Sequence, residues 1–268
     1  MTRCCRRRRA ARSRRIETDV EGKVVVITGA NNGIGLGLFK ALAERGWWVA
    51  GLDLSVENLP AEHSFVCDVT DLGRVERVIG QVVERWGRID VLVNNACLAI
   101  FSPFEEKSLA DTRREFEVNI VGYINTIKAV LPTMKSQGGG VIHNVSSTVG
   151  ISGFAGIYGY ASTKGAIDAL TRTLALELEP YGIVVNLVYP PLTRTRSASP
   201  LGIPASFMAD PDVVGRKLAG KIGSRQPVVT PGFVESIGVF MTRMMPRLMG
   251  RFLSGRAAAA REASTGGM

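Results

Sequence analysis

Cysteine and histidine are scarce in this chain of 268 residues, which contains four cysteines and two histidines. The cysteines, at positions 4, 5, 67 and 97, have neither the spacing of a zinc site nor that of a disulfide framework. We therefore expect no metal site, and we interpret Cys67 and Cys97 as small buried thiols in a reducing cytoplasm. His63 and His143 lie near expected strands without a partner pattern, so neither receives a role.

Long apolar segments are also missing. No run approaches the ~18 apolar residues that a membrane-spanning helix needs. The hydrophobic share of 46% is ordinary for a globular protein. The length suits one α/β domain with a substantial core.

Acidic residues are absent from the first 15 positions, which hold eight arginines. Subtracting these charges from the net charge of +9 leaves +1 (9 − 8), so the rest of the chain has no basic excess for nucleic acid. We expect residues 1–19 to be a disordered arginine-rich tail, because like charges repel and nothing apolar can pack there. A Sec or twin-arginine signal would need an apolar run after the arginines, where Ile16-Glu17-Thr18-Asp19 stands instead. A mitochondrial presequence and an upstream start that cells do not use both stay open.

A tyrosine and a lysine four residues apart, Tyr160 and Lys164, stand just inside a strongly helical segment. Residues at this spacing share a helix face. A lysine held beside a tyrosine favours the phenolate and lowers the phenol's pKa from about 10, which makes it an acid or base usable near neutral pH. The pattern alone is common by chance. Its weight comes from its place, 13 residues after Ser147 and downstream of a glycine-rich turn.

That turn follows an apolar run near the start of the chain. The run Val24-Val25-Val26-Ile27 suits a buried parallel strand, and Gly29, Gly33 and Gly35 allow a tight turn that brings the backbone close to a ligand. The helix that begins there offers free N–H groups and a positive dipole end to a pyrophosphate. The next expected strand ends at Asp53, about 20 residues on, where a carboxylate is expected to bond the adenosine ribose hydroxyls.

An ordered series of short motifs continues through residues 20–196. The motifs are Thr28-Gly29-x-x-x-Gly33-Ile34-Gly35, Asp68-Val69, Asn94-Asn95-Ala96, Asn119, Asn144-Val145-Ser146-Ser147, Tyr160 with Lys164, and Asn186, Pro190 and Thr195. In this order and at these spacings they resemble the short-chain dehydrogenase/reductase family. Cys97 and Pro191 depart from the family pattern, because each replaces a glycine. Proline fixes φ and removes an N–H, so the loop on the nicotinamide side must differ locally, but neither change removes a reacting group.

Strands and helices alternate along the chain, with strands expected at 24–28, 48–52, 64–67, 89–93, 141–145, 184–188 and 227–230. The alternation predicts an α/β fold with a parallel sheet and helices on both faces. The resemblance implies a single-domain Rossmann-type doubly wound sheet of about seven strands. We place this NAD-binding catalytic domain at 20–232, with a substrate lid at about 191–222. Ligands of such sheets bind beyond the carboxyl ends of the strands, so the motif residues are expected to converge on one edge.

The resemblance implies hydride transfer between nicotinamide and a secondary alcohol or ketone carbon. It implies four catalytic residues, each with its own role. Tyr160 would exchange the hydroxyl proton, and Lys164 would lower the pKa of Tyr160 and bond the nicotinamide ribose. Ser147 would hydrogen-bond the substrate oxygen, and Asn119 would anchor a water chain that carries the proton to solvent.

Two rivals of these residues are set aside. Tyr158 is a rival phenol, but Ser162, four residues further on, cannot supply a charge. Ser146 is a rival hydroxyl. The family spacing to the tyrosine selects Ser147, and we interpret Ser146 as structural.

The expected cofactor is NAD rather than NADP. The cofactor-binding residues that we predict are Gly29, Asn32, Gly33, Ile34, Gly35, Asp53, Asp68, Val69, Asn94, Asn95, Ala96, Tyr160, Lys164, Pro190, Thr193 and Thr195. A carboxylate at Asp53 accepts hydrogen bonds from both ribose hydroxyls of NAD and repels a 2′-phosphate. No neighbouring cation is evident, since Asn31-Asn32 and Leu54-Ser55 are uncharged.

Residues 233–268 are expected to form an amphipathic C-terminal helix and a flexible tail. Arginines recur every four residues, and a second stripe is apolar. The arginines are Arg243, Arg247 and Arg251, and the apolar residues are Val239, Phe240, Met244, Leu248 and Phe252. A basic amphipathic helix suits a membrane surface or a partner groove. The helix could equally pack on its own domain or on a second subunit, and these alternatives stay open. The resemblance also implies a cytoplasmic homodimer or homotetramer.

The expected function is an NAD(P)-dependent oxidoreductase for a secondary alcohol and its ketone. Apolar lid residues such as Leu201, Ile203, Phe207 and Met208 favour a hydrophobic substrate, for example a lipid, steroid or terpenoid. The alternatives are a reductase of small polar carbonyls or acyl thioesters, and a non-catalytic cofactor-sensing protein on the same fold.

Overall fold

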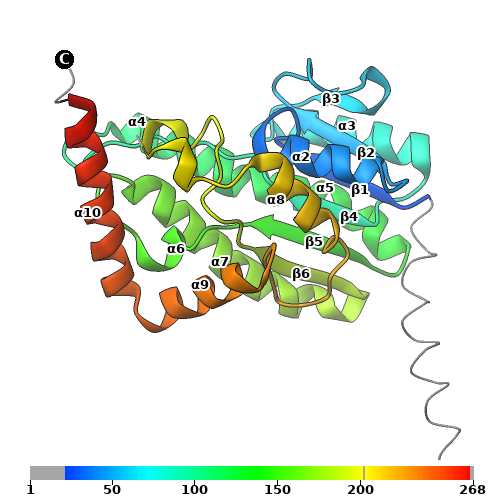
Figure 1. Ribbon diagram of the computed structural model, residues 1–268. Coiled ribbons are helices and arrows are strands. Elements are labelled where there is room, and N and C mark those ends of the chain that lie inside the picture. The colour runs from blue at the N-terminus through cyan, green and yellow to red at the C-terminus, as the bar shows by residue number, and fades with distance from the viewer. Residues whose placement is uncertain (1–21, 202, 266–268) are drawn as a thin grey trace, which may run out of the picture.

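The computed structural model of the protein describes residues 22–201 and 203–265, so the expected arginine-rich tail lies outside the described residues. Within them, seven strands form one parallel sheet in the order β3-β2-β1-β4-β5-β6-β7 (Figure 1). The strands are β1 (Val24–Thr28), β2 (Trp48–Asp53), β3 (Ser64–Val66), β4 (Val91–Asn94), β5 (Gly140–Val145), β6 (Ile183–Val188) and β7 (Val228–Val229). The predicted doubly wound α/β sheet is confirmed.

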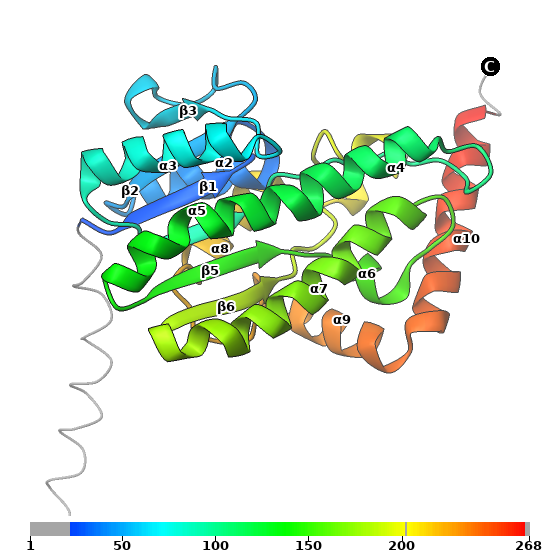
Figure 2. The ribbon, with the colours of Figure 1, turned by 180° about the vertical axis from the view of Figure 1, so that it is seen from behind.

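Helices cover both faces of the sheet. One face carries α2 (Gly33–Ala43) and α8 (Pro211–Ala219), which lie in front of the strands in Figure 1. The other carries α3 (Leu72–Trp86), α5 (Gly122–Ser136) and α7 (Tyr158–Leu178), which lie in front in Figure 2. The remaining helices are α4 (Leu109–Phe116), α6 (Val149–Ser152), α9 (Phe233–Met244) and α10 (Pro246–Thr265), with 3-10 turns at Ala61–His63, Glu179–Tyr181, Ser199–Leu201 and Ala205–Phe207.

The central strand β1 supplies both layers of the core. Successive side chains of a strand point to opposite faces of the sheet. Val24 and Val26 accordingly pack with the α3 and α5 side, and Val25 and Ile27 with the α2 and α8 side. All four are fully buried, as the continuous β-branched run predicts for a central parallel strand.

Helix α8, which the sequence reasoning included in the substrate lid, packs backbone to backbone against α2. A Cβ on Gly215 would lie 2.2 Å from the carbonyl carbon of Gly37, and a Cβ on Gly37 would lie 2.5 Å from the carbonyl oxygen of Pro211. Asp210 caps α8 by accepting hydrogen bonds from the N–H groups of Asp212 and Val213. Helix α8 is thus a layer helix, and the chain between Pro191 and Asp210 is what covers the sheet edge.

The C-terminal segment forms two helices where one was expected. Helix α9 ends at Met244, and Met245 has φ −132° and ψ 59° before Pro246 opens α10. A proline disfavours helical backbone at the residue before it, which explains the break. The expected stripe of three arginines is therefore split. All three arginines are exposed, but the Arg243 guanidinium on α9 lies 5.8 Å from the ring centroid of buried Tyr189, and Arg247 and Arg251 lie on α10.

The described helices include none whose length and apolar character would let it cross a membrane.

Candidate active site

A cavity of about 730 Å³ lies at the carboxyl ends of the central strands. Its walls come from the turns after β1, β2, β4, β5 and β6, from the Pro191–Phe207 region, and from α9 and α10. Most of the predicted site residues line it: Gly29, Asn32, Gly33, Ile34, Asp53, Asp68, Val69, Asn95, Ala96, Ser147, Tyr160, Lys164, Pro190, Thr193 and Thr195. The sheet edge thus brings together residues that are far apart in the sequence.

Three predicted residues, Gly35, Asn94 and Asn119, are not part of the cavity wall. A Cβ at Gly35 would lie 2.1 Å from the carbonyl oxygen of Gly29, so this glycine lets α2 start against the turn. Asn94 is fully buried and donates to Asn144 Oδ1 at 2.9 Å. It also accepts from Thr126 Oγ1 at 2.6 Å. Asn94 therefore ties β4 to β5 and α5.

The glycine turn has the backbone that the sequence predicts. Gly29 and Gly33 have φ of 65° and 57°, in the left-handed region that favours glycine. Asn32 precedes α2 without a side-chain cap on it, so its side chain satisfies none of the orphan N–H groups that a helix start presents. A positive helix end facing a long cavity, with a carboxylate at Asp53, fits the pyrophosphate and ribose of a nicotinamide dinucleotide.

Thr28 and Asn95 join the glycine turn to the turn after β4. The Thr28 hydroxyl accepts from the N–H groups of Asn95 and Ala96, both at 3.0 Å. The Asn95 amide donates to the carbonyls of Thr28 and Gly29, both at 3.0 Å. Sequence reasoning assigned no role to Thr28, although its place at the strand end was visible.

Asp53 lines the cavity from the carboxyl end of β2. Its carboxylate accepts from the N–H of Asn31 at 2.9 Å and from that of Leu54 at 2.8 Å. Arg196 also lines the cavity. The pKa of the nearby Glu57 is lowered, mostly by a backbone hydrogen bond and in smaller part by the Arg196 charge. Sequence reasoning missed this cation, because it comes from a segment far along the chain.

The catalytic candidates meet on one wall of the cavity. Tyr160 and Lys164 lie in the first turns of α7, and Ser147 follows β5. The Lys164 Nζ donates to the Val145 carbonyl at 2.9 Å and lies 5.4 Å from the ring centroid of Tyr160. Ser147 hydrogen-bonds the phenol of Tyr160.

Burial, rather than the lysine, dominates the pKa of Tyr160. Burial raises this pKa, the charge of Cys97 adds to the rise, and the hydrogen bond from Ser147 opposes it. Burial also lowers the pKa of Lys164, against the charges of Cys97 and Asp168. The expected lowering of the phenol pKa by Lys164 is therefore not found, since the ammonium is itself desolvated and is anchored to a backbone carbonyl.

Asn119 sits in a π-helical turn, Glu117–Val121, between α4 and α5. Such turns often mark functional sites. Its amide donates to the Leu98 carbonyl at 2.8 Å and to Thr163 Oγ1 at 3.0 Å, and its oxygen accepts from the Leu98 N–H at 2.7 Å. Both of its N–H donors are thus used inside the protein, and Asn119 braces the chain after β4.

The rival hydroxyls of Tyr158 and Ser146 bond other side chains. Tyr158 bonds Thr112 Oγ1 at 2.6 Å and is not part of the cavity wall. Ser146 donates to Asp168 at 2.6 Å. Asp168 also accepts from the hydroxyl of Tyr189. Sequence reasoning missed this buried acid, although its place four residues after Lys164 puts both on one face of α7.

The two family departures lie on the cavity wall. Cys97 contributes to the pKa shifts of both Tyr160 and Lys164, which places its thiol beside the reacting groups. The Pro191 carbonyl accepts from Thr193 Oγ1 at 2.8 Å. Cys67 is buried, and burial raises the pKa of its thiol to about 11, in keeping with an unreactive core residue.

Comparison with known proteins gives one family and a range of relatives. The family described as short chain dehydrogenase matches residues 23–203. An uncharacterized oxidoreductase of Thermotoga maritima is 36% identical over 228 residues, which are 81% of this chain and 87% of the relative. The L-fucose dehydrogenase of Bos taurus is 37% identical over 181 residues, 65% of this chain and 67% of its own. The 3-alpha-(or 20-beta)-hydroxysteroid dehydrogenase of Mycobacterium tuberculosis is 34% identical over 182 residues, 65% and 70% of the two chains.

Solved structures of similar fold include proteins with a nicotinamide cofactor bound. A 3-ketoacyl-(acyl-carrier-protein) reductase from Brucella melitensis, complexed with NADH, matches with a TM-score of 0.71 and 27% identity, covering 80% of this chain and 99% of its own. The protein ElxO with NADP bound matches with a TM-score of 0.68 and 26% identity, covering 78% and 96%.

Proposed function

This chain belongs to the short chain dehydrogenase family, and we propose that it interconverts a hydrophobic secondary alcohol and its ketone with NAD(H). The observation that carries this proposal is one cavity lined by two sets of residues. Ser147, Tyr160 and Lys164 form one set, and the glycine turn and Asp53 form the other. A dinucleotide stretched between them would present its nicotinamide to the phenol.

Tyr160 is the proposed general acid and base. In the reduction it donates its proton to the substrate oxygen, and in the oxidation it takes that proton back. A phenol is protonated at neutral pH, and burial raises the pKa of Tyr160 further, so the form that donates is the one present. The nicotinamide, when bound, supplies or takes up the hydride. The Ser147 hydroxyl, already bonded to the phenol, orients the substrate oxygen.

Lys164 is the proposed anchor of the nicotinamide ribose. An ammonium has three N–H donors, and the Val145 carbonyl takes one of them. The others are available for ribose hydroxyls. The water chain that the family resemblance implies for Asn119 stays a proposal. Movement of the substrate lid also stays a proposal, and we place this lid between Pro191 and Asp210, N-terminal to α8.

The preference for NAD over NADP rests on Asp53. Its carboxylate is oriented by two backbone N–H groups and lines the cavity, so ribose hydroxyls are its natural partners. A 2′-phosphate would be repelled there. Arg196 is the residue that would favour NADP, and its charge contributes in small part to the lowered pKa of Glu57.

The hydrophobic substrate rests on the composition of the wall beyond Tyr160. That part is lined by Phe101, Phe154, Ile157, Leu201, Ile203, Phe207, Val239, Met241, Met249 and Leu253. Glu235 is the charged residue among its α9 neighbours. Few polar groups are available there to bond the hydroxyls of a sugar. A reductase of small polar carbonyls or acyl thioesters is the alternative, and the sugar and acyl-carrier relatives are its support.

The exposed surface of α9 and α10 supports a further proposal, peripheral contact with a membrane. Phe233, Val234, Phe240, Met244 and Leu248 are all exposed, the first of them by 80%. Arg247 and Arg251 flank them. Helices α9 and α10 also form part of the cavity wall. An apolar substrate dissolved in the membrane would therefore enter the cavity directly from the membrane surface. We also propose a cytoplasmic homodimer or homotetramer.

A substrate screen tests the function. The purified protein is given NADH or NADPH with ketosteroids, terpenoid ketones, acyl thioesters and ketoses, and the alcohols with NAD or NADP, while absorbance of the reduced cofactor is followed. We expect turnover with apolar ketones or alcohols and none in Tyr160→Phe. Turnover confined to acyl thioesters or sugars would favour the alternative, and no turnover with any class would sink the enzyme proposal.

A further inference from the structure

A buried ion pair, Lys107 with Glu115, lies behind the cavity wall. Neither side chain has exposed surface. Removing two charges from water costs about as much as their attraction returns, so a buried pair adds little net stability. Stability alone therefore explains this pair poorly. Neither residue is part of the cavity wall.

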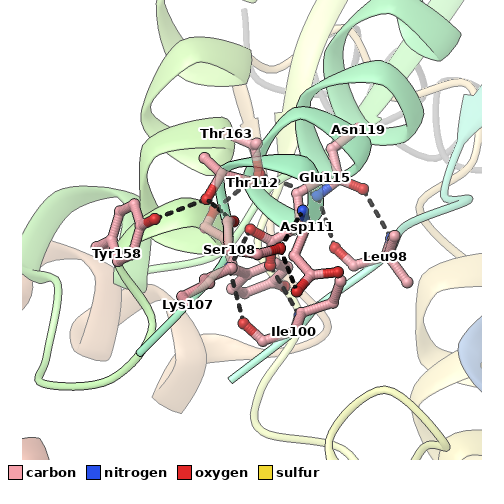
Figure 3. Close-up of polar contacts among 11 residues, drawn as sticks. Leu98, Ile100, Lys107, Ser108, Asp111, Thr112, Glu115, Asn119, Tyr158 and Thr163 are labelled. Carbon is pink, nitrogen blue, oxygen red and sulfur yellow. Dashed lines mark hydrogen bonds and ion pairs between the residues drawn. The ribbon is translucent and has the colours of Figure 1, made fainter. Parts of the chain in front are cut away.

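The pair binds both polar groups of one backbone residue, Ile100 (Figure 3). Glu115 Oε1 accepts from the Ile100 N–H at 2.7 Å, and Lys107 Nζ donates to the Ile100 carbonyl at 2.8 Å. Lys107 also donates to the other carboxylate oxygen of Glu115. The Ile100 peptide groups are thus held by side chains, as a neighbouring strand would hold them.

Asn119 holds Leu98 in the same way, through both its N–H and its carbonyl. Glu115 and Asn119 are four residues apart along α4 and the π-helical turn, so they share one helix face. Two successive braces keep the chain after β4 extended. In an extended chain alternate side chains point the same way, and Cys97, Ala99 and Phe101 are the members that line the cavity.

The ion pair also touches the helix that carries the catalytic tyrosine. A Cβ on Gly159 would lie 2.1 Å from Glu115 Oε2 and 2.7 Å from Lys107 Nζ. The start of α7 therefore rests directly on the pair. Phe101 meets Tyr160 edge to face, with ring centroids 6.1 Å apart.

We propose that Lys107 and Glu115 are positioning residues: they fix the Ile100 peptide so that Phe101 packs edge-on against Tyr160 and Ala99 faces the substrate. The pair sets the distance between the wall after β4 and the start of α7. This inference rests on the proposed function of Tyr160 as acid and base. Phe101 then limits how close a substrate comes to the phenol from that side.

Two double variants separate positioning from stability. Lys107→Met with Glu115→Gln removes both charges but leaves an amide that accepts from the Ile100 N–H. Lys107→Met with Glu115→Leu removes every bond to Ile100. Neither variant leaves a lone buried charge. Amide hydrogen exchange at Leu98 and Ile100, Tm, NADH binding, kcat and KM are measured for both and for the wild type.

In the leucine variant we expect exchange at Ile100 to rise at least about tenfold, while Leu98 stays protected by Asn119. We expect kcat to fall about tenfold or more with NADH affinity unchanged, and the glutamine variant to keep kcat within about threefold. Wild-type kcat in a folded leucine variant would overturn the proposal. So would a tenfold loss of kcat in a glutamine variant whose Ile100 stays protected, which needs no folded leucine variant. Should the wild type itself show no turnover, the proposed function fails, and unchanged exchange at Ile100 in the leucine variant would separately refute the brace.

Discussion

At the residue scale, the structure separates groups that react from groups that hold them. Ser147, Tyr160 and Lys164 line the cavity, whereas Asn119, Glu115 and Asp168 stand behind it with their polar atoms bonded to the protein. Burial raises the pKa of Tyr160, so the phenol is held still more firmly in its protonated form than a free tyrosine is. The three predictions at this scale concern proton transfer, cofactor choice and a buried histidine.

The substitution Tyr160→Phe is expected to lower kcat at least about a thousandfold and to leave NADH affinity within about threefold. It removes the proton donor and leaves the glycine turn and Asp53 intact. Lys164→Ala is expected to lower both kcat and the affinity for NADH, because it removes the ammonium beside the phenol and a donor to the ribose. Stopped-flow turnover and fluorescence titration with NADH measure the two effects. Substantial turnover by a folded Tyr160→Phe protein would exclude the tyrosine from the chemistry.

Cofactor preference is expected to depend on Asp53. The wild type should have the higher kcat/KM with NADH, and Asp53→Ala should shift the ratio toward NADPH by about tenfold or more, since one charge repulsion of about 1–2 kcal/mol is removed. Arg196→Ala is the matched control and should shift the ratio the opposite way. A wild type that prefers NADPH, or a ratio that Asp53→Ala leaves unmoved, would refute this role.

His143 predicts a loss of stability in acid. Burial lowers its pKa to about 4 from 6.5, and its ring is bonded between Asn186 and the Gly223 N–H. The unfolded chain takes up this proton below about pH 6.5 and the folded chain only near pH 4, so stability is complete above pH 6.5 and falls by up to about 3 kcal/mol as the pH drops to 4. Urea unfolding across this range measures the slope. His143→Gln should flatten it, and an equal slope in that variant would assign the effect to other groups.

At the element scale, packing decides where helices end and how close they come. Met245 breaks the C-terminal helix because Pro246 follows, and α2 meets α8 closely because Gly37 and Gly215 have no side chains. These contacts make α8 one of the helices that pack on the sheet, rather than part of the substrate lid.

The glycine contact predicts opposite effects of two glycine-to-alanine changes in helices. In Gly215→Ala the new methyl would lie 2.2 Å from α2 backbone, which must move, so we expect a loss of about 1–3 kcal/mol of unfolding free energy. At Gly80, in α3, a Cβ meets nothing within 4 Å, so Gly80→Ala should gain about 0.5–1 kcal/mol from helix propensity. Urea unfolding of both variants measures the difference. Equal effects would show that α2 and α8 separate at no cost.

The sequence predicts more of the sheet than of the site. Strands β1 and β6 read clearly, because their β-branched runs lie beside glycines and leave few alternatives. The residues that follow strand ends had to meet at one edge. The ion pair of Lys107 and Glu115 could not be read, because its charged segment looks like a solvated helix start. The pKa of Tyr160 was predicted in the wrong direction, since burial cannot be judged from the spacing of a tyrosine and a lysine.

At the scale of the whole molecule, the C-terminal helices have two roles. Their inner residues, such as Val239 and Met249, close the cavity. Their outer residues, such as Phe240 and Met244, are exposed by 60% and 62% and leave an apolar surface beside arginines. Exposed apolar area of this kind on the surface of a folded domain marks an interaction site.

That surface predicts binding to anionic vesicles. The full-length protein should float with vesicles that contain phosphatidylglycerol, less with phosphatidylcholine alone, and less again at high salt. The double substitution Phe240→Ser with Met244→Ser should weaken flotation, and Leu176→Ser, at an exposed site on α7, should not. Light scattering tests the other occupant of this surface, which is a second copy of the chain. A halved molar mass in the double variant, without vesicle binding by the wild type, would assign the surface to a second copy of the chain.

The order of the strands has a consequence for biosynthesis. β1 pairs with β2 and β4, and every later strand pairs with one that precedes it in the chain. As the ribosome releases the polypeptide, each new strand from β2 to β7 therefore meets a partner that has already emerged. The sheet can grow outward from its middle during translation, with β1 as its seed. A nascent chain stalled after β5 would already carry the glycine turn, Asp53 and Ser147 at one edge, before α7 delivers the tyrosine.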